Sequence, residues 1–147
     1  MPVPSFHIVE FHAAREDVDQ LGHVSNIRYV DWLQRAAQGH SAAMGFDVRA
    51  YREIGGIFVV RRHEIDYLRP AFAGELIRLH TQLEDCKLAS SVRVTEILRV
   101  ADAEGRAEET PVVLARGRTK WAFVDWDTGR PTSEPSSQNT CRVCSRS

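Results

Sequence analysis

Residues 25–44 read SNIRYVDWLQRAAQGHSAAM, and this stretch carries the clearest structural signal in the chain. Its polar residues recur every three or four positions, so on a helix they form one stripe. The other residues are mostly apolar or small, and so wide an apolar face is typical of a helix enclosed by other structure. Ser25 or Asn26 suits the N-cap, and Gly45 suits the position after the last turn. The stripe consists of Arg28, Asp31, Gln34, Arg35 and Gln38, and the apolar face of Ile27, Tyr29, Val30, Trp32, Leu33, Ala36, Ala37, Ala43 and Met44.

The sequence on both sides of this helix has the two-residue repeat of strands. One strand is expected before the helix, at residues 5–14, and four after it, at residues 57–68, 77–84, 91–100 and 111–126. Strands joined by short turns pair antiparallel, and a single apolar helix must be covered by their sheet. The sequence therefore predicts an α+β fold in which one sheet curls around one helix.

Two of the predicted strands have sides of different character. In the strand at 91–100, one side carries the apolar residues Val92, Val94, Leu98 and Val100, interrupted by Glu96. In the last strand, one side carries small residues over which a helix can pack closely, namely Ala115, Gly117 and Thr119. The other side of that strand is basic, with Arg116, Arg118 and Lys120 in succession.

The length of 147 residues suits one ordinary domain, and 43% hydrophobic with 27% charged residues is the composition of a globular protein. From residue 128 on, the sequence is rich in Gly, Pro, Ser, Thr and Arg. Such a segment buries too little apolar surface to offset its ordering entropy. We therefore expect a single domain over residues 1–130 and a flexible C-terminal tail over residues 131–147.

Charge and cysteine usage limit the partners and the compartment. The 19 basic and 20 acidic residues give a net charge of −1, which excludes a protein that coats nucleic acid with a general positive field. No run approaches the roughly 20 apolar residues of a membrane span, and the first residues lack the pattern of a signal peptide. The three cysteines have no disulfide-framework spacing, so reduced thiols and a cytoplasmic protein are expected.

The densest group of reactive residue types lies directly before the helix, in REDVDQLGHVSN at residues 15–26. Asp19 and His23 are separated by Gly22, so a tight turn can bring both into one pocket. The helix start adds unpaired N–H groups and the positive end of a dipole, which can hold a developing oxyanion. The alternative is that Asp17 and Asp19 only cap or solvate a turn, as aspartate often does.

Residues 17–36, DVDQLGHVSNIRYVDWLQRA, closely resemble the signature of the 4-hydroxybenzoyl-CoA thioesterase-like family of hotdog-fold acyl-CoA thioesterases. That signature is an Asp, a Gly-His or equivalent turn, an Asn that opens the helix, and an aromatic residue three positions later. A second block, residues 58–71 followed by Gly74 and Leu76, resembles the family as well. The resemblance spans about residues 6–126 and implies the hotdog fold, an antiparallel sheet wrapped around one long central helix.

The resemblance implies roles for the loop residues. It places the catalytic carboxylate at Asp19, three residues before Gly22, as the nucleophile toward a thioester carbonyl or as the general base for water. His23 then either orients the carbonyl or the water, or merely closes the turn. Ser25 stands where close relatives often have a second Asn, which implies altered detail rather than lost activity. The oxyanion would be received by the backbone N–H groups of Val24, Ser25 and Asn26.

The family resemblance also implies the substrate and the assembly. The expected reaction is hydrolysis of an acyl-CoA or an acyl-carrier-protein thioester to the free acid and thiol, with no metal or redox cofactor. In this family the acyl-CoA lies at a subunit interface, which implies a homodimer or a homotetramer of two dimers. Coenzyme A is strongly anionic, so its phosphates need local cations. The candidates are Arg61, Arg62, Arg116, Arg118 and Lys120, all of which are alternatively just solvated.

Other readings remain open at this stage. A non-catalytic acyl-thioester-binding module is one alternative, and an enoyl-thioester hydratase is a weaker one because its Asn-Pro spacing is missing here. Cys141 and Cys144 have half of a zinc-ribbon spacing, but nothing completes four ligands. The aromatic residues Trp121, Phe123 and Trp126 either line an acyl pocket or pack in the core.

Overall fold

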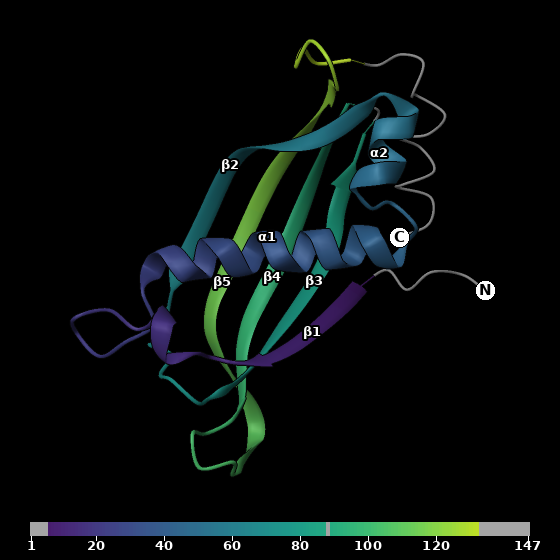
Figure 1. The fold of residues 1–147 in the computed structure, drawn as a ribbon. Helices are drawn as coiled ribbons and strands as arrows, with labels where there is room; N and C mark the ends of the chain where they lie inside the picture. Colours follow the sequence, from purple (N-terminus) through teal and green to yellow (C-terminus); the bar gives the residue numbers. More distant parts are fainter. Residues whose placement is uncertain (1–5, 88, 133–147) are drawn as a thin grey trace.

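The computed structural model describes residues 6–87 and 89–132 of the chain. The strands are β1 (Phe6–His12), β2 (Gly56–Tyr67), β3 (Leu76–Cys86), β4 (Ser90–Ala101) and β5 (Ala107–Asp125). The helices are α1 (Asn26–Ala43), α2 (Val48–Ile54) and a short 3-10 turn, η1 (Arg15–Asp17). All strand pairs are antiparallel, in the order β1-β3-β4-β5-β2, and α1 lies across one face of the sheet (Figure 1). The predicted α+β architecture is confirmed.

Helix α1 forms where the sequence predicts it, to within one residue at each end. Ser25 is the N-cap, and its hydroxyl oxygen accepts a hydrogen bond from the Ile27 N–H at 3.4 Å. The buried face is narrower than the sequence suggests, because Ile27 is 73% exposed and Ala43 is also exposed. The sheet covers only one side of the helix, and the residues facing it are Tyr29, Trp32, Leu33, Ala36, Ala37 and His40.

The small residues of β5 let α1 approach the sheet closely, as predicted. Ala115 is completely buried and Thr119 is 3% exposed. A Cβ atom on Gly117 would lie 2.6 Å from the Cδ2 atom of Leu33, closer than side chains can pack. Leu33 therefore occupies the space that the missing side chain leaves, and this contact fixes the middle of α1 over β5.

The sequence analysis did not predict helix α2. The Asp47 carboxylate caps its start by accepting the Ala50 N–H at 2.8 Å. The buried Tyr51 packs α2 against a second, smaller core cluster with Met44, Phe46 and Phe123. This cluster lies beyond the C-terminal end of α1, where Figure 1 shows α2 beside the upper part of the sheet. Seven residues are too few to show a clear helical repeat, so this segment reads as a loop in the sequence.

The predicted strands are all present, with two differences. Strand β5 begins at Ala107, four residues before the predicted Pro111. On β4 the valine side is the less buried one, because Val92 and Val94 are only half-buried. The residues that β4 directs toward the interior are Ser91, Arg93, Thr95 and Ile97.

The start of the predicted tail still contacts the domain. Pro131 forms an isolated bridge with Val124, and the Thr132 N–H donates to the Phe123 carbonyl at 3.2 Å. The rest of the tail, including Cys141 and Cys144, lies outside the described residues. Within the described part of the chain, no helix is long and apolar enough to span a membrane.

Candidate active site

The loop before α1 is a tight turn closed by backbone hydrogen bonds. Val18 and Val24 form an isolated antiparallel bridge, and the Asp19 N–H donates to the His23 carbonyl at 2.8 Å. The Gly22 N–H returns to the Asp19 carbonyl at 3.1 Å, with Gly22 at a φ of 84° that other residues rarely adopt. The turn thus holds Asp19 and His23 directly before the start of α1, whereas their meeting in one pocket stays a prediction.

This turn is anchored on the segment that follows β2. The Val24 N–H donates to the carbonyl of Ala71 at 2.8 Å, and both residues are buried. The N–H of Ala71 in turn donates to the Tyr29 hydroxyl at 3.0 Å. Burial raises the pKa of Tyr29 despite this contact, so the hydroxyl stays neutral at physiological pH. Together these bonds tie the loop, the first turn of α1 and residue 71 into one rigid unit.

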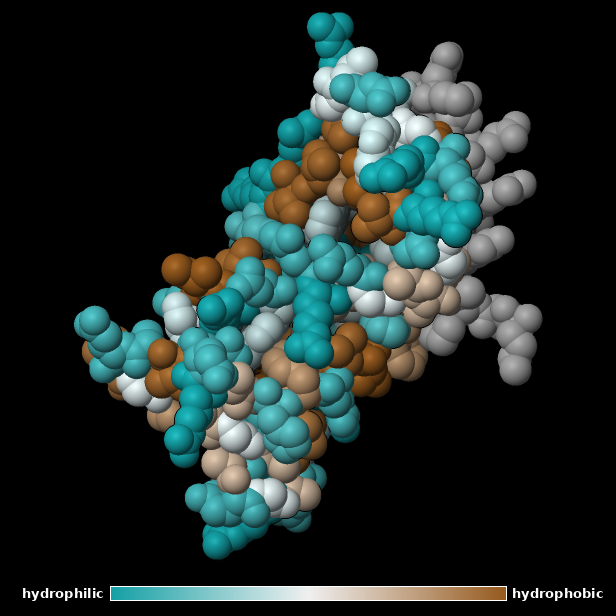
Figure 2. All heavy atoms as spheres, viewed as in Figure 1, coloured by the Kyte–Doolittle hydropathy of each residue, from teal (hydrophilic) through white to brown (hydrophobic). Residues whose placement is uncertain are grey.

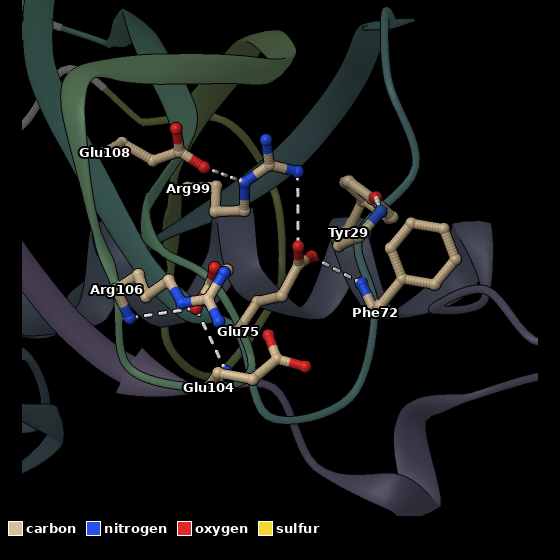
Figure 3. Close-up of polar contacts among 9 residues, drawn as sticks. Tyr29, Phe72, Glu75, Arg99, Glu104, Arg106 and Glu108 are labelled. Carbon is tan, nitrogen blue, oxygen red and sulfur yellow. Dashed lines mark hydrogen bonds and ion pairs between the residues drawn. The ribbon is translucent and has the colours of Figure 1, made fainter.

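The buried carboxylate of Glu75 holds the segment around Ala71 and Phe72 in place (Figure 3). Glu75 is 5% exposed, and its Oε1 accepts the Phe72 N–H at 2.6 Å. Its Oε2 pairs with Arg99 Nη1 at 3.2 Å, and Arg99 Nε reaches Glu108 at 2.8 Å. The Phe72 ring meets the His23 ring edge-on at a centroid distance of 5.3 Å. This ion-pair cluster therefore positions the surroundings of His23.

The two carboxylates of the loop have different surroundings. Asp17 is engaged on both oxygens, since Oδ1 pairs with Arg28 Nε at 3.3 Å and Oδ2 accepts the Ala14 N–H at 3.2 Å. Asp19 is exposed, and its Oδ1 accepts the Leu21 N–H at 2.8 Å. Its Oδ2 has no partner among the described residues, and the His23 ring is not hydrogen-bonded to it. Asp17 is thus a structural residue, whereas Asp19 caps its own turn with one oxygen and presents the other to solvent.

The backbone N–H groups at the start of α1 are partly occupied. The Val24 N–H is used by Ala71, and the Ser25 N–H donates to the Asp17 carbonyl at 2.8 Å. The Asn26 N–H has no acceptor among the residues that the structure describes, and Asn26 is exposed. In this structure, Asn26 therefore offers the available donor of the three.

The predicted cations are all exposed, on β2 and β5, and several are paired. Arg62 pairs with Glu64 at 2.9 Å, Arg116 pairs with Glu96 at 3.4 Å, and Arg118 contacts Glu84. Arg61 and Lys120 have no ion pair within the described ranges. A hollow of about 160 Å³ is lined by Arg62, Glu64, Val92, Arg118 and Lys120, so three of the five candidates lie together.

The aromatic and cysteine residues singled out in the sequence lie in different surroundings. Phe123 is fully buried in the second core cluster, and Trp126 packs against the same cluster. Trp121 lines a cavity, described below. Cys86 is disulfide-bonded, so the reduced thiol predicted at this position is wrong. Among residues 6–87 and 89–132, no group of His, Cys, Asp and Glu is arranged to hold a metal ion.

A large cavity, about 610 Å³, lies between the C-terminal half of α1, α2 and the inner side of the sheet. Much of its lining is apolar, including Phe58 and Val60 of β2. Figure 2 shows hydrophobic side chains gathered above α1, between the upper part of β2 and α2. Arg93 of β4 also lines the cavity although it is 5% exposed, and it contacts the buried His40 of α1. The sequence analysis missed both polar residues.

The fold and the acidic loop at the start of the central helix define a hotdog-fold protein. A family model for the thioesterase-like superfamily matches residues 14–139, and the chain belongs to this superfamily. No curated protein sequence matches the chain significantly.

Solved structures agree with the fold over nearly the whole chain. A mutant 4-hydroxybenzoyl-CoA thioesterase complexed with 4-hydroxybenzoyl-CoA superposes with a TM-score of 0.80 at 16% identity, covering 97% of this chain and 100% of that one. A 1,4-dihydroxy-2-naphthoyl-CoA thioesterase from Synechocystis gives 0.76 at 16% identity, covering 95% and 96%. A probable thioesterase from Bartonella henselae gives 0.75 at 24% identity, covering 88% and 99%. The hotdog fold that the sequence resemblance implies is therefore confirmed.

Proposed function

We propose that this protein hydrolyses an acyl thioester of coenzyme A, or of an acyl-carrier protein, with Asp19 as the catalytic carboxylate. Membership of the thioesterase-like superfamily supports the reaction class. The thioesterases with which the chain shares its fold act, by their names, on aromatic acyl-CoA substrates. The single observation that carries the choice of residue is the contrast between the two loop carboxylates. Asp19 keeps one oxygen uncommitted, whereas Asp17 uses both oxygens for structure.

The proposed mechanism needs an ionised carboxylate next to the thioester carbonyl carbon. Asp19 either attacks that carbon directly or removes a proton from the attacking water. The oxyanion that forms would lie at the start of α1, where the dipole is positive and the Asn26 N–H is available. His23 is held against Phe72, and in this proposal it orients the carbonyl or the water. In the direct route, the C–S bond breaks to leave a mixed anhydride on Asp19, which water then hydrolyses to the free acid. In the water route, the C–S bond breaks and the free acid forms at once. In both routes, the proton that the thiol carries away comes from water.

We propose in addition that the enzyme is a homodimer or a dimer of dimers. Strand β2 ends the sheet order, so one side of its twelve-residue backbone is unpaired in the single chain. A long open edge strand is a natural pairing site for a second copy. Light scattering of the purified protein tests this, and a monomer at micromolar concentration would contradict it.

The hollow on the outer side of the sheet is the proposed site for the phosphates of coenzyme A. Arg62, Arg118 and Lys120 surround it, and Arg61 lies next to Arg62 in the sequence. Lys120 has no carboxylate partner within the described ranges. Its replacement by Gln should therefore raise KM for acyl-CoA more than kcat falls, and unchanged kinetics would contradict the assignment.

The experiment that tests the function is thiol release from a panel of short, long and aromatic acyl-CoAs, with Asp19→Asn and Asp17→Asn as a matched pair. The wild type should hydrolyse at least one member. Asp19→Asn keeps the size of the side chain but removes its basicity, so kcat should fall by roughly 10²–10⁴. Asp17→Asn loses only a half-exposed ion pair and should keep activity within several-fold.

The panel also separates the competing functions. Binding of acyl-CoA without turnover by the wild type would favour a non-catalytic binding module. In that case Asp19 would only cap its turn, through the hydrogen bond that it accepts from the Leu21 N–H. Addition of water to an enoyl-CoA with the thioester intact would favour a hydratase. An equal loss of kcat in Asp19→Asn and Asp17→Asn would contradict the assignment of Asp19 as the catalytic carboxylate.

A further inference from the structure

Cys86, the last residue of β3, is disulfide-bonded, and the sequence offers it few partners. The chain has three cysteines in all, Cys86, Cys141 and Cys144. A disulfide within the chain must join two of them, so the partner of Cys86 is Cys141 or Cys144. Both lie outside the described residues, and the sequence alone identifies them.

The described part of the chain ends close to Cys86. The Thr132 N–H donates to the Phe123 carbonyl at 3.2 Å, and the Phe123 N–H donates to the Ala89 carbonyl at 2.9 Å. Ala89 belongs to the short connection between β3 and β4, directly before β4 begins. Two backbone hydrogen bonds in series therefore link the last described residue to the turn that follows Cys86.

The length of the remaining chain permits either link. Cys141 is nine positions after Thr132, and Cys144 is twelve positions after it. An extended chain spans up to about 3.5 Å per residue, so nine residues reach roughly 30 Å. Because Thr132 lies beside the turn that follows Cys86, distance excludes neither cysteine as the partner.

Cys141 and Cys144 have the C-x-x-C spacing of redox-active pairs. Whichever of them is bonded to Cys86, the other is a third thiol three positions away. Its thiolate can attack the sulfur of its neighbour. The bond from that sulfur to Cys86 then breaks, a Cys141–Cys144 disulfide forms, and the Cys86 thiolate takes up the proton that the attacking thiol has lost. One disulfide replaces another, so this exchange needs neither an oxidant nor a reductant.

Cys86 also lies on the wall of the 610 Å³ cavity, with Leu83 of β3 and Trp121 of β5. Its side chain is half-buried, so its disulfide lies at the edge of the cavity and not in the core. A segment bonded to Cys86 must meet this wall at the point of attachment, whereas a segment closed by Cys141–Cys144 is not held there. Exchange thus changes what covers an apolar cavity.

We propose that Cys86, Cys141 and Cys144 form a thiol–disulfide site with two oxidised states. In the tethered state, a disulfide to Cys86 holds residues 133–147 at the cavity wall. In the released state, the Cys141–Cys144 disulfide leaves Cys86 as a thiol and the cavity open on that side. A dithiol reductant converts either state into three thiols by supplying two electrons and two protons. The site is independent of the proposed hydrolysis, since Asp19 takes no part in it.

Disulfide mapping of the full chain tests the site. The protein is equilibrated with reduced and oxidised dithiothreitol at about pH 8.5, where thiolates form, then quenched, alkylated and analysed by peptide mass spectrometry. The wild type should show both linkages, with one of its three cysteines alkylated. At least one of Cys141→Ser and Cys144→Ser should show only the link to Cys86, because the third thiol is missing. Cys86→Ser should show only Cys141–Cys144.

Three results of the mapping would overturn the proposal. One is complete alkylation of Cys86 in an excess of oxidised dithiothreitol. Another is a Cys86 disulfide that persists when Cys141 and Cys144 are both replaced by Ser, since this would show pairing between two chains. A single linkage in the wild type at every ratio of the two dithiothreitol forms would overturn the exchange.

The dye anilinonaphthalene sulfonate, which binds exposed apolar surface, tests the effect on the cavity. Cys86→Ser, which represents the released state, should bind the dye several-fold more tightly than the tethered Ser variant. After complete reduction by dithiothreitol the two variants should bind it equally, because they then differ only in which sulfur is replaced by oxygen. Equal binding before reduction, or a difference that survives reduction, would overturn the covering of the cavity by residues 133–147.

Discussion

Strand β4 carries two arginines, Arg93 and Arg99, whose surroundings differ sharply. The side chain of Arg99 is 23% exposed and is paired with two carboxylates, Glu75 and Glu108. Arg93 is 5% exposed and is held by the neutral side chains of His40 and Thr81. The same residue type on the same strand is thus neutralised at one end of the sheet and left as a buried charge at the other.

The difference separates a structural cation from one available to a ligand. The Arg99 cluster fixes the segment after β2, on which the loop of residues 15–26 is anchored (Figure 3). The Arg93 site opens on a cavity instead, and no carboxylate among residues 6–87 and 89–132 compensates its charge, which costs stability. We expect stability to depend on Arg99 far more than on Arg93.

The largest effect on stability should come from Arg99→Met. This change leaves the Glu75 carboxylate, which is 5% exposed, without its cation. Breaking a buried ion pair on one side costs about 3 kcal/mol, at the lower end of the known range because Arg99 is partly exposed. Urea unfolding at neutral pH measures it.

The matched control for this variant is Arg78→Met. Arg78 Nε pairs with Glu10 at 2.7 Å, but both side chains are more exposed, at 34% and 39%. Such a pair contributes at most about 1 kcal/mol. Equal destabilisation by the two variants would show that the Glu75 cluster is not a special support of the fold.

A smaller effect of opposite sign is expected for Arg93→Met. Methionine fills much of the same volume and removes a buried charge that no carboxylate of the described residues compensates. His40 and Thr81 both lose a donor, but Thr81 keeps its contact with Thr95. The free energy of unfolding should stay unchanged or rise by about 1 kcal/mol, measured in the same urea series. A loss above about 2 kcal/mol would make Arg93 a structural residue like Arg99.

The sequence predicts the fold well because its repeats are strong. The helical stripe from Arg28 to Gln38 and the strand alternation fix one helix and five strands, and the small residues of β5 mark where Leu33 approaches the sheet. Helix α2 is missed because seven residues carry little periodicity. Its stability comes from Tyr51 packing on the second core, a contact between distant parts of the chain.

The candidate site is predictable only where it is local in sequence. The turn from Asp19 to His23 is visible because its residues are neighbours. Arg93 is not, because an arginine between Val92 and Val94 reads as an outward residue of a strand whose valines face the core. The structure reverses these sides, and only the pairing of β4 with β3 brings Thr81 and Arg93 together. The alternating polar residues Ser91, Arg93 and Thr95 were the one sign in the sequence that this side of the strand could carry a buried polar group.

The smallest expected effect concerns His7 of β1, which reports the charge of Arg93. The His7 ring stacks on His40 with centroids 5.6 Å apart. Burial, and secondly the positive charge of Arg93, hold the pKa of His7 below its usual 6.5. A nearby cation disfavours protonation, so removing it must move this pKa upward. In Arg93→Met the pKa of His7 should therefore rise, yet stay below 6.5 because burial remains, as an NMR titration of the His7 ring proton can measure.

Arg99→Met serves as the comparison for this titration, because Arg99 does not contribute to the His7 pKa. The lowered pKa of His7 also determines how its contribution to folding stability changes with pH. A histidine whose pKa is lowered by folding takes up protons more readily in the unfolded chain, so its contribution is complete above about pH 6.5 and declines as the pH falls. Arg93→Met should weaken this acid sensitivity, and Arg99→Met should not. An unchanged His7 titration in Arg93→Met would contradict this expectation, because the charge of Arg93 would then have no effect on the His7 ring.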